Sequence, residues 1–140
     1  MTHKLYLSLG SNLGDRETNI RQALALIDER VGSVYRVSSC IETAPVGFSS
    51  PNKFINVVCL VHTMMSPMAC LRETQKIEKE LGRTQKSINP DGSLTYKDRL
   101  IDIDLLTYDQ LVLNTPELTL PHPRMHERDF VQIPLREIQE

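Results

Sequence analysis

The stretch Leu5-Tyr6-Leu7-Ser8-Leu9-Gly10-Ser11-Asn12-Leu13-Gly14-Asp15 decides how the fold begins. Leucines alternate with Tyr6 and Ser8 over residues 5–9, which is the pattern of a strand with one apolar face. The residues from Gly10 onward break that strand, and Asp15 is a residue type that caps helices. The first unit of the chain is therefore a strand that leads directly into a helix.

The same two patterns recur along the rest of the chain. Helical apolar spacing predicts helices over residues 16–31 and, after a Ser66-Pro67 start, up to Gly82. Strands are predicted at residues 4–9, 34–42, 54–63 and 99–106, with 111–114 as the hairpin partner of the last. This order of elements predicts an α+β, ferredoxin-like fold, in which helices pack on a mainly antiparallel sheet.

Two stretches between these elements are expected to be irregular. Residues 43–52 contain prolines, a glycine and serines, and residues 83–98 are polar with almost no apolar periodicity. A long structureless stretch inside a compact domain is usually functional. Near the C-terminal end we expect a short helix within 121–128, and we expect Pro134 to limit any longer one. Residues 1–140 are interpreted as a single domain.

Composition narrows the class of protein. The 140 residues carry 16 basic and 18 acidic side chains, a net charge of -2, which argues against a nucleic-acid partner. No apolar run is long enough to cross a membrane, and no signal peptide is visible. Three cysteines without a paired motif are typical of reduced thiols. We therefore expect a cytoplasmic protein without a nucleic-acid or membrane partner, and we interpret it as a monomer.

The most informative side chains are two aspartates in one strand, Asp102 and Asp104. Alternate residues of a strand share a face, so both carboxylates project together from an apolar setting. A divalent cation would relieve their mutual repulsion, and a pair of Mg²⁺ ions fits such carboxylates. The alternative is a solvated strand face on which the carboxylates contact only water.

Basic residues near this strand suggest phosphate contacts. Arg83 and Arg99 bracket the long polar stretch, and Arg128 follows later in the chain. Guanidinium groups bind phosphate oxygens through two donors at once, although an isolated arginine is more often a surface residue. Glycine-rich nucleotide-binding motifs are absent, so metal and arginine would have to hold a nucleotide. His122 and His126 have helical spacing, but the sequence offers no third zinc ligand nearby.

The chain resembles the 6-hydroxymethyl-7,8-dihydropterin pyrophosphokinase family from about residue 5 to 138. The blocks that carry this resemblance are ordered and correctly spaced: residues 9–15, 43–47, 54–56, 74–78, 82–83, 99–106 and 120–128. Several such blocks are far more specific than an aspartate pair alone.

The resemblance implies transfer of diphosphate from ATP to the hydroxymethyl group of a dihydropterin, with release of AMP, in folate biosynthesis. It implies that Asp102 and Asp104 hold two Mg²⁺ ions and, with Arg83 and Arg99, form the catalytic set. The implied ATP contacts are Gln75, Arg83, Arg99, His122 and Arg128. The implied pterin contacts are Phe54 and Phe130 on the two ring faces, and Thr43, Val46 and Asn56 at the ring edge.

The chain departs from the family pattern in the polar stretch. Tyr96-Lys97-Asp98-Arg99 stands where the family often has Trp-Gly-Pro-Arg, and Gln85 stands where some members have a second arginine. Two other functions remain open at this point. One is a different metal-dependent kinase or nucleotidyl transferase, which would release a different product. The other is a non-catalytic binding module, for instance for RNA, although Asp102 and Asp104 would repel phosphate without a cation.

Overall fold

The computed structural model describes residues 2–43, 53–82, 87–88, 94–95 and 100–139 of the chain. Its elements, in chain order, are β1 (His3–Ser11), α1 (Arg16–Arg30), β2 (Ser33–Val37), β3 (Ile41–Thr43), β4 (Phe54–Thr63), α2 (Pro67–Glu80), β5 (Ser87–Ile88), β6 (Leu94–Thr95), β7 (Asp102–Tyr108), β8 (Leu113–Asn114), β9 (Thr119–Leu120), the 3-10 helix η1 (Met125–Glu127) and α3 (Asp129–Ile138).

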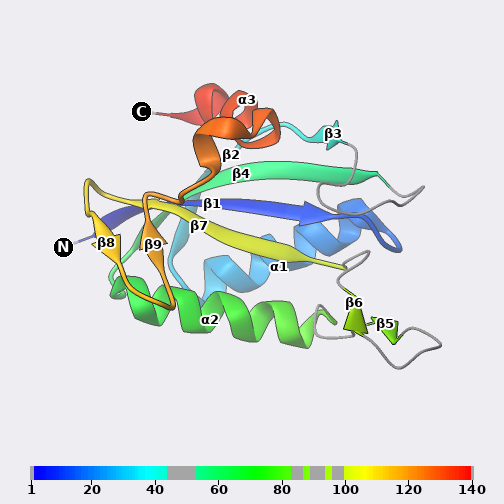
Figure 1. Ribbon diagram of the computed structural model, residues 1–140, viewed down its shortest axis with the longest axis horizontal. Helices are drawn as coiled ribbons and strands as arrows, with labels where there is room; N and C mark the ends of the chain where they lie inside the picture. The colour runs from blue at the N-terminus through cyan, green and yellow to red at the C-terminus, as the bar shows by residue number, and fades with distance from the viewer. Residues whose placement is uncertain (1, 44–52, 83–86, 89–93, 96–99, 140) are drawn as a thin grey trace.

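The main sheet is antiparallel, with the strand order β2-β4-β1-β7 and with β3 also paired to β4. Helix α1 follows β1 and helix α2 follows β4, so the chain has the βαββαβ order of a ferredoxin-like fold. The fold class expected from the sequence is therefore confirmed. Figure 1 shows β1 in the middle of the sheet, with β4 and β7 on its two sides.

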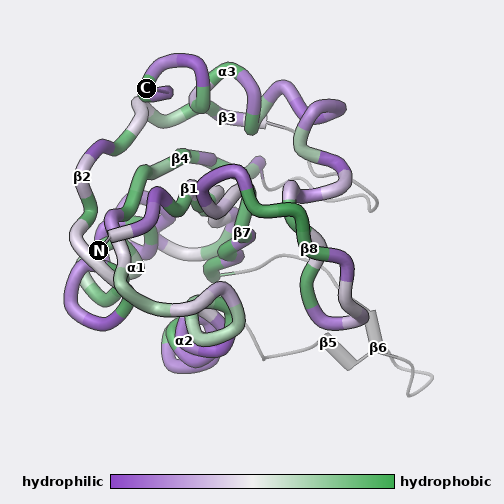
Figure 2. Tube along the Cα trace, turned by 90° about the vertical axis from the view of Figure 1, so that its left-hand side faces the viewer, coloured by the Kyte–Doolittle hydropathy of each residue, from purple (hydrophilic) through white to green (hydrophobic). Residues whose placement is uncertain are grey.

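The sheet separates two apolar clusters, because neighbouring residues of each strand point to opposite sides. The larger cluster contains Leu5, Leu7 and Leu9 of β1 and packs against α1 and α2. The smaller cluster contains Tyr6 of β1 and packs against α3. We call the sheet surface that carries Tyr6 the α3-side face. Figure 2 shows α3 on one side of the strands and α2 on the other.

Helices α1 and α2 begin where the sequence predicts their caps. The Asp15 carboxylate accepts a hydrogen bond from the Thr18 backbone N–H at 3.1 Å, and the Ser66 hydroxyl accepts one from the Ala69 N–H at 3.3 Å. Helix α2 ends at Glu80 with Leu81 as its C-cap, and the next residue, Gly82, has a φ of +99°, which favours glycine. A Cβ at Gly82 would also lie 2.6 Å from Leu100, so this helix end passes close to the chain entering β7.

The predicted strand 34–42 is instead two strands, β2 and β3. The ladder is irregular between Val34 and Arg36, and the chain leaves the strand geometry at Ser38. Ser38 is buried, its N–H donates to the Val58 carbonyl, and its hydroxyl accepts from the Val58 N–H. These two bonds satisfy the backbone N–H and carbonyl of Val58 in β4, but they interrupt the regular ladder between the strands. The alternation of apolar residues in the sequence does not reveal this interruption.

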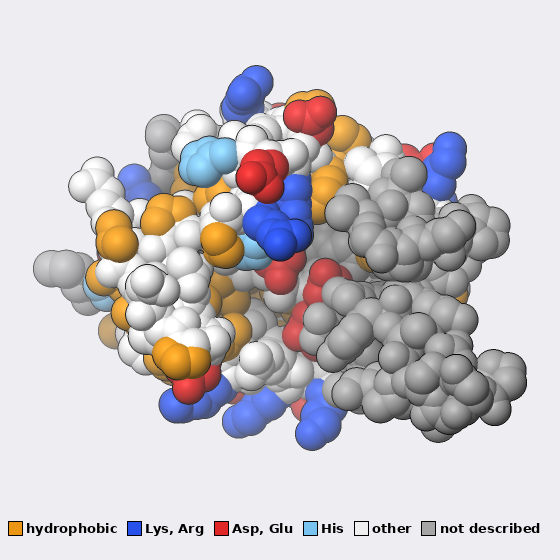
Figure 3. All heavy atoms as spheres, in the orientation of Figure 1, with side chains coloured by type: hydrophobic (Ala, Val, Ile, Leu, Met, Phe, Trp, Pro, Cys, Tyr) orange, Lys and Arg blue, Asp and Glu red, His pale blue; other side chains and the backbone are white. Residues whose placement is uncertain are grey.

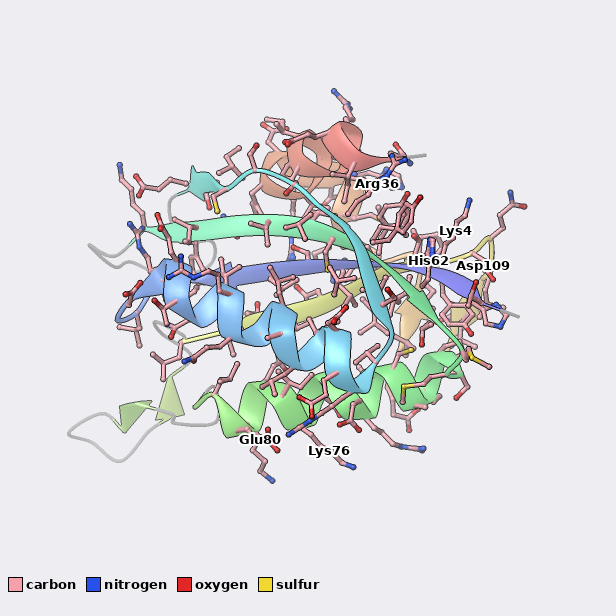
Figure 4. All side chains as sticks on the ribbon, turned by 180° about the vertical axis from the view of Figure 1, so that it is seen from behind. Lys4, Arg36, His62, Lys76, Glu80 and Asp109 are labelled. Carbon is pink, nitrogen blue, oxygen red and sulfur yellow. The ribbon has the colours of Figure 1, made fainter. Side chains whose placement is uncertain are left out.

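The hairpin predicted between 99–106 and 111–114 is wrong, because β8 pairs with β9 instead. The chain turns away after Tyr108 because Asp109 has a φ of +50° and its carboxylate accepts the Lys4 N–H at 2.7 Å. The same carboxylate contacts the His3 imidazole at 2.7 Å. Lys4, His62 and Asp109 lie together at this end of the sheet (Figure 4).

Four smaller expectations also need correction. Strand β7 begins at Asp102 and runs to Tyr108, later than the predicted 99–106, and the polar stretch 83–98 contains the short pair β5–β6. The predicted helix within 121–128 is only the single 3-10 turn η1. Helix α3 continues through Pro134, because its apolar stripe of Val131, Leu135 and Ile138 is buried against the α3-side face.

All three cysteines are free thiols, and burial raises the pKa of the Cys59 thiol to about 12.

Within the described ranges, no helix is long and apolar enough to cross a membrane.

We expect Leu7→Ala to lower the free energy of unfolding by about 2–5 kcal/mol, because it opens a cavity at a side chain that is 0 % exposed in the central strand. Leu111→Ala is the matched control, since Leu111 is 40 % exposed, and we expect a change below about 0.5 kcal/mol. Urea unfolding measures both. Equal losses would contradict the placement of Leu7 in the core.

Candidate active site

One row of residues crosses three strands on the α3-side face. Gly10 of β1 lies directly opposite Asn56 of β4 on one side and Asp102 of β7 on the other. Residues that lie directly opposite in an antiparallel sheet project to the same face. We call Asn56, Gly10 and Asp102 the site row. In the next row along the face, Ser8 lies opposite Asp104.

Asp102 and Asp104 therefore share the α3-side face, as the sequence predicts, and both are half-buried. Ile103 between them is buried in the larger cluster on the opposite side of the sheet. In Figure 3, acidic side chains lie at the centre of the view, below basic and histidine side chains, where the surface is hollowed.

Glu78 supports the backbone between the two aspartates. This carboxylate of α2 is only 4 % exposed and accepts the Ile103 N–H at 2.7 Å. The contact fixes β7 to the helix layer at the residue that separates Asp102 from Asp104. The sequence analysis missed this residue. Its signal is a glutamate directly after Ile77, on the buried side of an amphipathic helix, where a carboxylate needs a hydrogen-bond donor.

The donor set suits Mg²⁺. Two carboxylates on one rigid strand face supply the oxygen ligands that hard cations prefer. Within the described part of the chain, no group of three or more metal-ligating side chains occurs. That limit still fits Mg²⁺, because this ion is commonly held by one or two carboxylates, with phosphate and water completing its coordination.

His122 lies beside this acidic pair. Its backbone N–H donates to the Leu106 carbonyl of β7 at 2.8 Å, after the cis Leu120–Pro121 peptide. Its Nδ1 accepts the Arg124 N–H at 3.2 Å, which assigns the proton of the neutral ring to Nε2. Burial lowers the pKa of His122, the Arg128 guanidinium lowers it further, and Asp102 opposes the shift. His122 thus presents a neutral N–H donor.

Arg128 and Phe130 stand at the start of α3. The guanidinium carbon of Arg128 lies 5.6 Å from the centroid of the Phe130 ring, within the range of a cation–π contact. Phe130 packs against the smaller cluster, so it lies on the same side of the sheet as the aspartates. The structure thereby brings Arg128, Phe130 and His122 to the α3-side face.

Asn56 is held by the neighbouring strand. It is 4 % exposed, and its Nδ2 donates to Thr43 Oγ1 at 2.8 Å and to the Ile41 carbonyl at 3.3 Å. Both amide hydrogens are used, so Oδ1 remains as an acceptor on the side of Gly10. A Cβ at Gly10 would lie 3.0 Å from that oxygen and 3.3 Å from Cδ1 of Phe54. The absence of a side chain at Gly10 leaves room for the side chains of Asn56 and Phe54.

Of the other contact residues implied by the resemblance, only Gln75 is described. Gln75 is on the exposed surface of α2, in the helix layer rather than on the α3-side face. Val46, Arg83 and Arg99 lie outside the described residues, as do Gln85 and Tyr96-Lys97-Asp98.

The lowered pKa of His122 predicts a loss of stability in acid. Because the pKa of the folded state lies below the ordinary 6.5, protonation favours the unfolded chain. The contribution of His122 is therefore full above about pH 6.5 and is lost as the pH falls through the folded-state pKa. Imidazole ¹⁵N NMR should show a midpoint below 6.5 and a proton on Nε2. A midpoint at or above 6.5 would contradict the assigned burial.

Comparisons with known proteins show the family of the chain. Residues 6–140 match the family model for 7,8-dihydro-6-hydroxymethylpterin-pyrophosphokinase (HPPK). The chain is 47 % identical over 135 residues to the 2-amino-4-hydroxy-6-hydroxymethyldihydropteridine pyrophosphokinase of Porphyromonas gingivalis, covering 96 % of this chain and 89 % of that protein. It is 42 % identical over 139 residues to the Bacillus subtilis protein of the same name, covering 99 % and 79 %.

A solved structure supports the same fold. The Plasmodium falciparum HPPK-DHPS wild type with pteroate superimposes with a TM-score of 0.75 at 13 % identity, over 98 % of this chain. This chain spans 41 % of that larger protein. The family match over nearly the whole chain and the two bacterial relatives show that the chain belongs to the 7,8-dihydro-6-hydroxymethylpterin-pyrophosphokinase family.

Proposed function

We propose that the site row and its neighbours on the α3-side face are the active site for the reaction of this family. That reaction is ATP-dependent transfer of diphosphate to 6-hydroxymethyl-7,8-dihydropterin, giving AMP and the pterin diphosphate, in folate biosynthesis. The observation that carries the proposal is the site row itself. The strand backbone holds Asn56 and Asp102 on either side of Gly10. A heterocycle bound at Asn56 and a phosphate bound near Asp102 would therefore have a fixed distance and orientation relative to each other.

We assign the metal to Asp102 and Asp104, as two Mg²⁺ ions. Their oxygen donors and shared face support this assignment. When bound, Mg²⁺ would neutralise and orient the triphosphate. Glu78 would keep the two carboxylates in place through the Ile103 N–H.

Phosphate contacts come from basic groups on the same side of the sheet. The neutral imidazole of His122 carries its proton on Nε2. It can therefore donate a hydrogen bond to a phosphate oxygen without first taking up a second proton. Arg128 supplies a positive charge beside it. We assign Gln75, Arg83 and Arg99 to the nucleotide as well, on the resemblance to the family alone.

The pterin is assigned to the Asn56 end of the site row. Phe54 and Phe130 are proposed to pack on its two ring faces, because flat heterocycles bind well against aromatic side chains. The Oδ1 of Asn56, on the side of Gly10, would accept a ring N–H, and Thr43 holds the amide group that carries it. Thr43 and Val46 are proposed to contact the ring edge through their backbone.

In the proposed step, the hydroxymethyl oxygen of the pterin attacks the β-phosphorus of ATP in line with the leaving group. A new O–P bond forms, the bond from the β-phosphorus to the oxygen on the α-phosphorus breaks, and AMP leaves. The hydroxyl proton passes to solvent. The side chains act by holding the two substrates in this alignment and by stabilising phosphate charge.

We further propose that residues 1–140 work as one pyrophosphokinase domain, as a cytoplasmic monomer without a nucleic-acid partner. The net charge of -2 supports the last point. Light scattering on the purified protein measures the oligomeric state, and a dimer mass would contradict the monomer.

The reaction is tested by incubating the protein with ATP, Mg²⁺ and 6-hydroxymethyl-7,8-dihydropterin and separating the nucleotides. AMP should form in step with pterin diphosphate and stop with EDTA, whereas ADP or free pyrophosphate would indicate a different transferase.

Asp104→Ala should lower kcat by roughly 10²-fold or more while leaving the fold intact. Exposed Glu117 in the β8–β9 hairpin gives the control Glu117→Ala, which should keep normal turnover. Near-normal turnover in Asp104→Ala would refute the metal assignment.

Gly10→Ala should weaken pterin binding more than nucleotide binding. The new Cβ would lie 3.0 Å from Asn56 Oδ1 and 3.3 Å from Phe54, so both side chains must shift. We expect the KM for the pterin to rise roughly tenfold, while the KM for ATP changes little. Steady-state kinetics with each substrate varied in turn measures this difference. Equal effects on both substrates would show that Gly10 is not specific to the pterin end of the site.

A further inference from the structure

Arg16 stands at a position that helix energetics disfavours. It is the first residue of α1, directly after the cap Asp15. The first turn of a helix carries partial positive charge, so a cation there is unfavourable. The reason for an arginine at this position must therefore lie in contacts outside its own helix.

Those contacts are on the β3–β4 pair. The Arg16 Nη1 donates to Glu42 Oε2 at 3.1 Å and to the Lys53 backbone carbonyl at 2.8 Å. Glu42 belongs to β3, and Lys53 immediately precedes β4. The Lys53 Nζ lies 4.0 Å from the other oxygen of Glu42. One guanidinium thus connects α1 to the chain on either side of residues 44–52.

The β3–β4 pair carries the pterin end of the proposed site. Thr43 lies directly opposite Phe54, one residue beyond Glu42 and Lys53 respectively. Thr43 also accepts the hydrogen bond that orients the Asn56 amide. Strand β3 has three residues and pairs only with β4 among the described strands. Such a short edge strand has few ladder hydrogen bonds, so side-chain bonds weigh heavily in its position.

We propose that Arg16 is a positioning residue for pterin binding. By holding Glu42 and the Lys53 carbonyl, it keeps β3 in place against β4, and so it keeps the Thr43–Asn56 hydrogen bond and the Phe54 ring in register. This inference rests on the proposed function of the site. Arg16 itself does not contact the substrate.

A purely structural role would give a different result. The Arg16 and Glu42 side chains are 34 % and 49 % exposed, and exposed ion pairs contribute little to global stability. Removing a cation from the first helical turn even favours α1. Loss of Arg16 should therefore leave the unfolding midpoint nearly unchanged and alter the affinity of one substrate.

The test compares Arg16→Ala with Arg21→Ala. Arg21 lies on the same helix, is exposed, and donates to Thr18 Oγ1 at 3.2 Å, so it is a matched control. Arg16→Ala should raise the KM for the pterin roughly tenfold, with kcat and the KM for ATP within about twofold. Arg16→Lys should restore part of the affinity. Adding Glu42→Gln to Arg16→Ala should cause little further loss, because both changes remove the same contact. Identical pterin KM values in Arg16→Ala and Arg21→Ala would overturn the proposal.

Amide hydrogen exchange separates this proposal from the assigned reaction. Exchange at Thr43 and Phe54 should be faster in Arg16→Ala than in Arg21→Ala, whether or not the protein turns over pterin. Equal exchange in the two variants would overturn the positioning role. An inactive wild-type protein with faster exchange in Arg16→Ala would instead refute the reaction and leave the link from α1 to β3–β4 supported.

Discussion

The antiparallel register of β4, β1 and β7 is the constraint on which the site depends. Side chains alternate along each strand, so a slip of one residue between β1 and β7 would turn Asp102 and Asp104 toward α1 and α2. Two carboxylates would then be buried among leucines and isoleucines, at a large cost in free energy. The apolar cluster under the sheet therefore keeps the acidic residues on the other side. The same packing that stabilises the fold sets the position of the polar groups.

The acidic and the basic side chains of the site come from two different segments of the chain. Strand β7 supplies carboxylates, and Glu78 adds a third one behind them. The chain from His122 to Phe130 supplies donors and positive charge, and these basic groups are close enough to act on the pKa of His122. A ligand that combines a cation with a polyanion would interact favourably with both the carboxylates and the basic groups. A simple anion or a simple cation would interact favourably with only one of the two.

Much of this arrangement follows from patterns of period two and period 3.6. The leucines at 5, 7 and 9 predict the central strand and its buried side, and the caps at Asp15 and Ser66 predict where the helices start. The spacing of Asp102 and Asp104 predicts their shared face. Each of these rests on local sequence, which is why sequence reasoning reaches it.

Several failures involve contacts between distant residues. The turn after Tyr108 depends on Asp109 binding Lys4, and the break at Ser38 depends on Val58. The burial of Glu78 depends on an N–H of β7, and the continuation of α3 through Pro134 depends on the sheet beneath it. None of these partners can be identified from spacing within one segment.

The position of β1 has a consequence for how the chain folds during synthesis. Strand β1 is the central strand, yet its partner β7 is made only after α1, the strands β2 to β6 and α2. Gly10 and Asp102, which lie opposite each other in the sheet, are therefore far apart in the sequence. A nascent chain can pair β1 with β4 as a partial sheet, but that sheet keeps an unpaired edge until residue 108 has been synthesised. Such high contact order slows folding and leaves a strand edge available to wrong partners. The acidic pair can therefore take its place beside Gly10 only after β7 has been made.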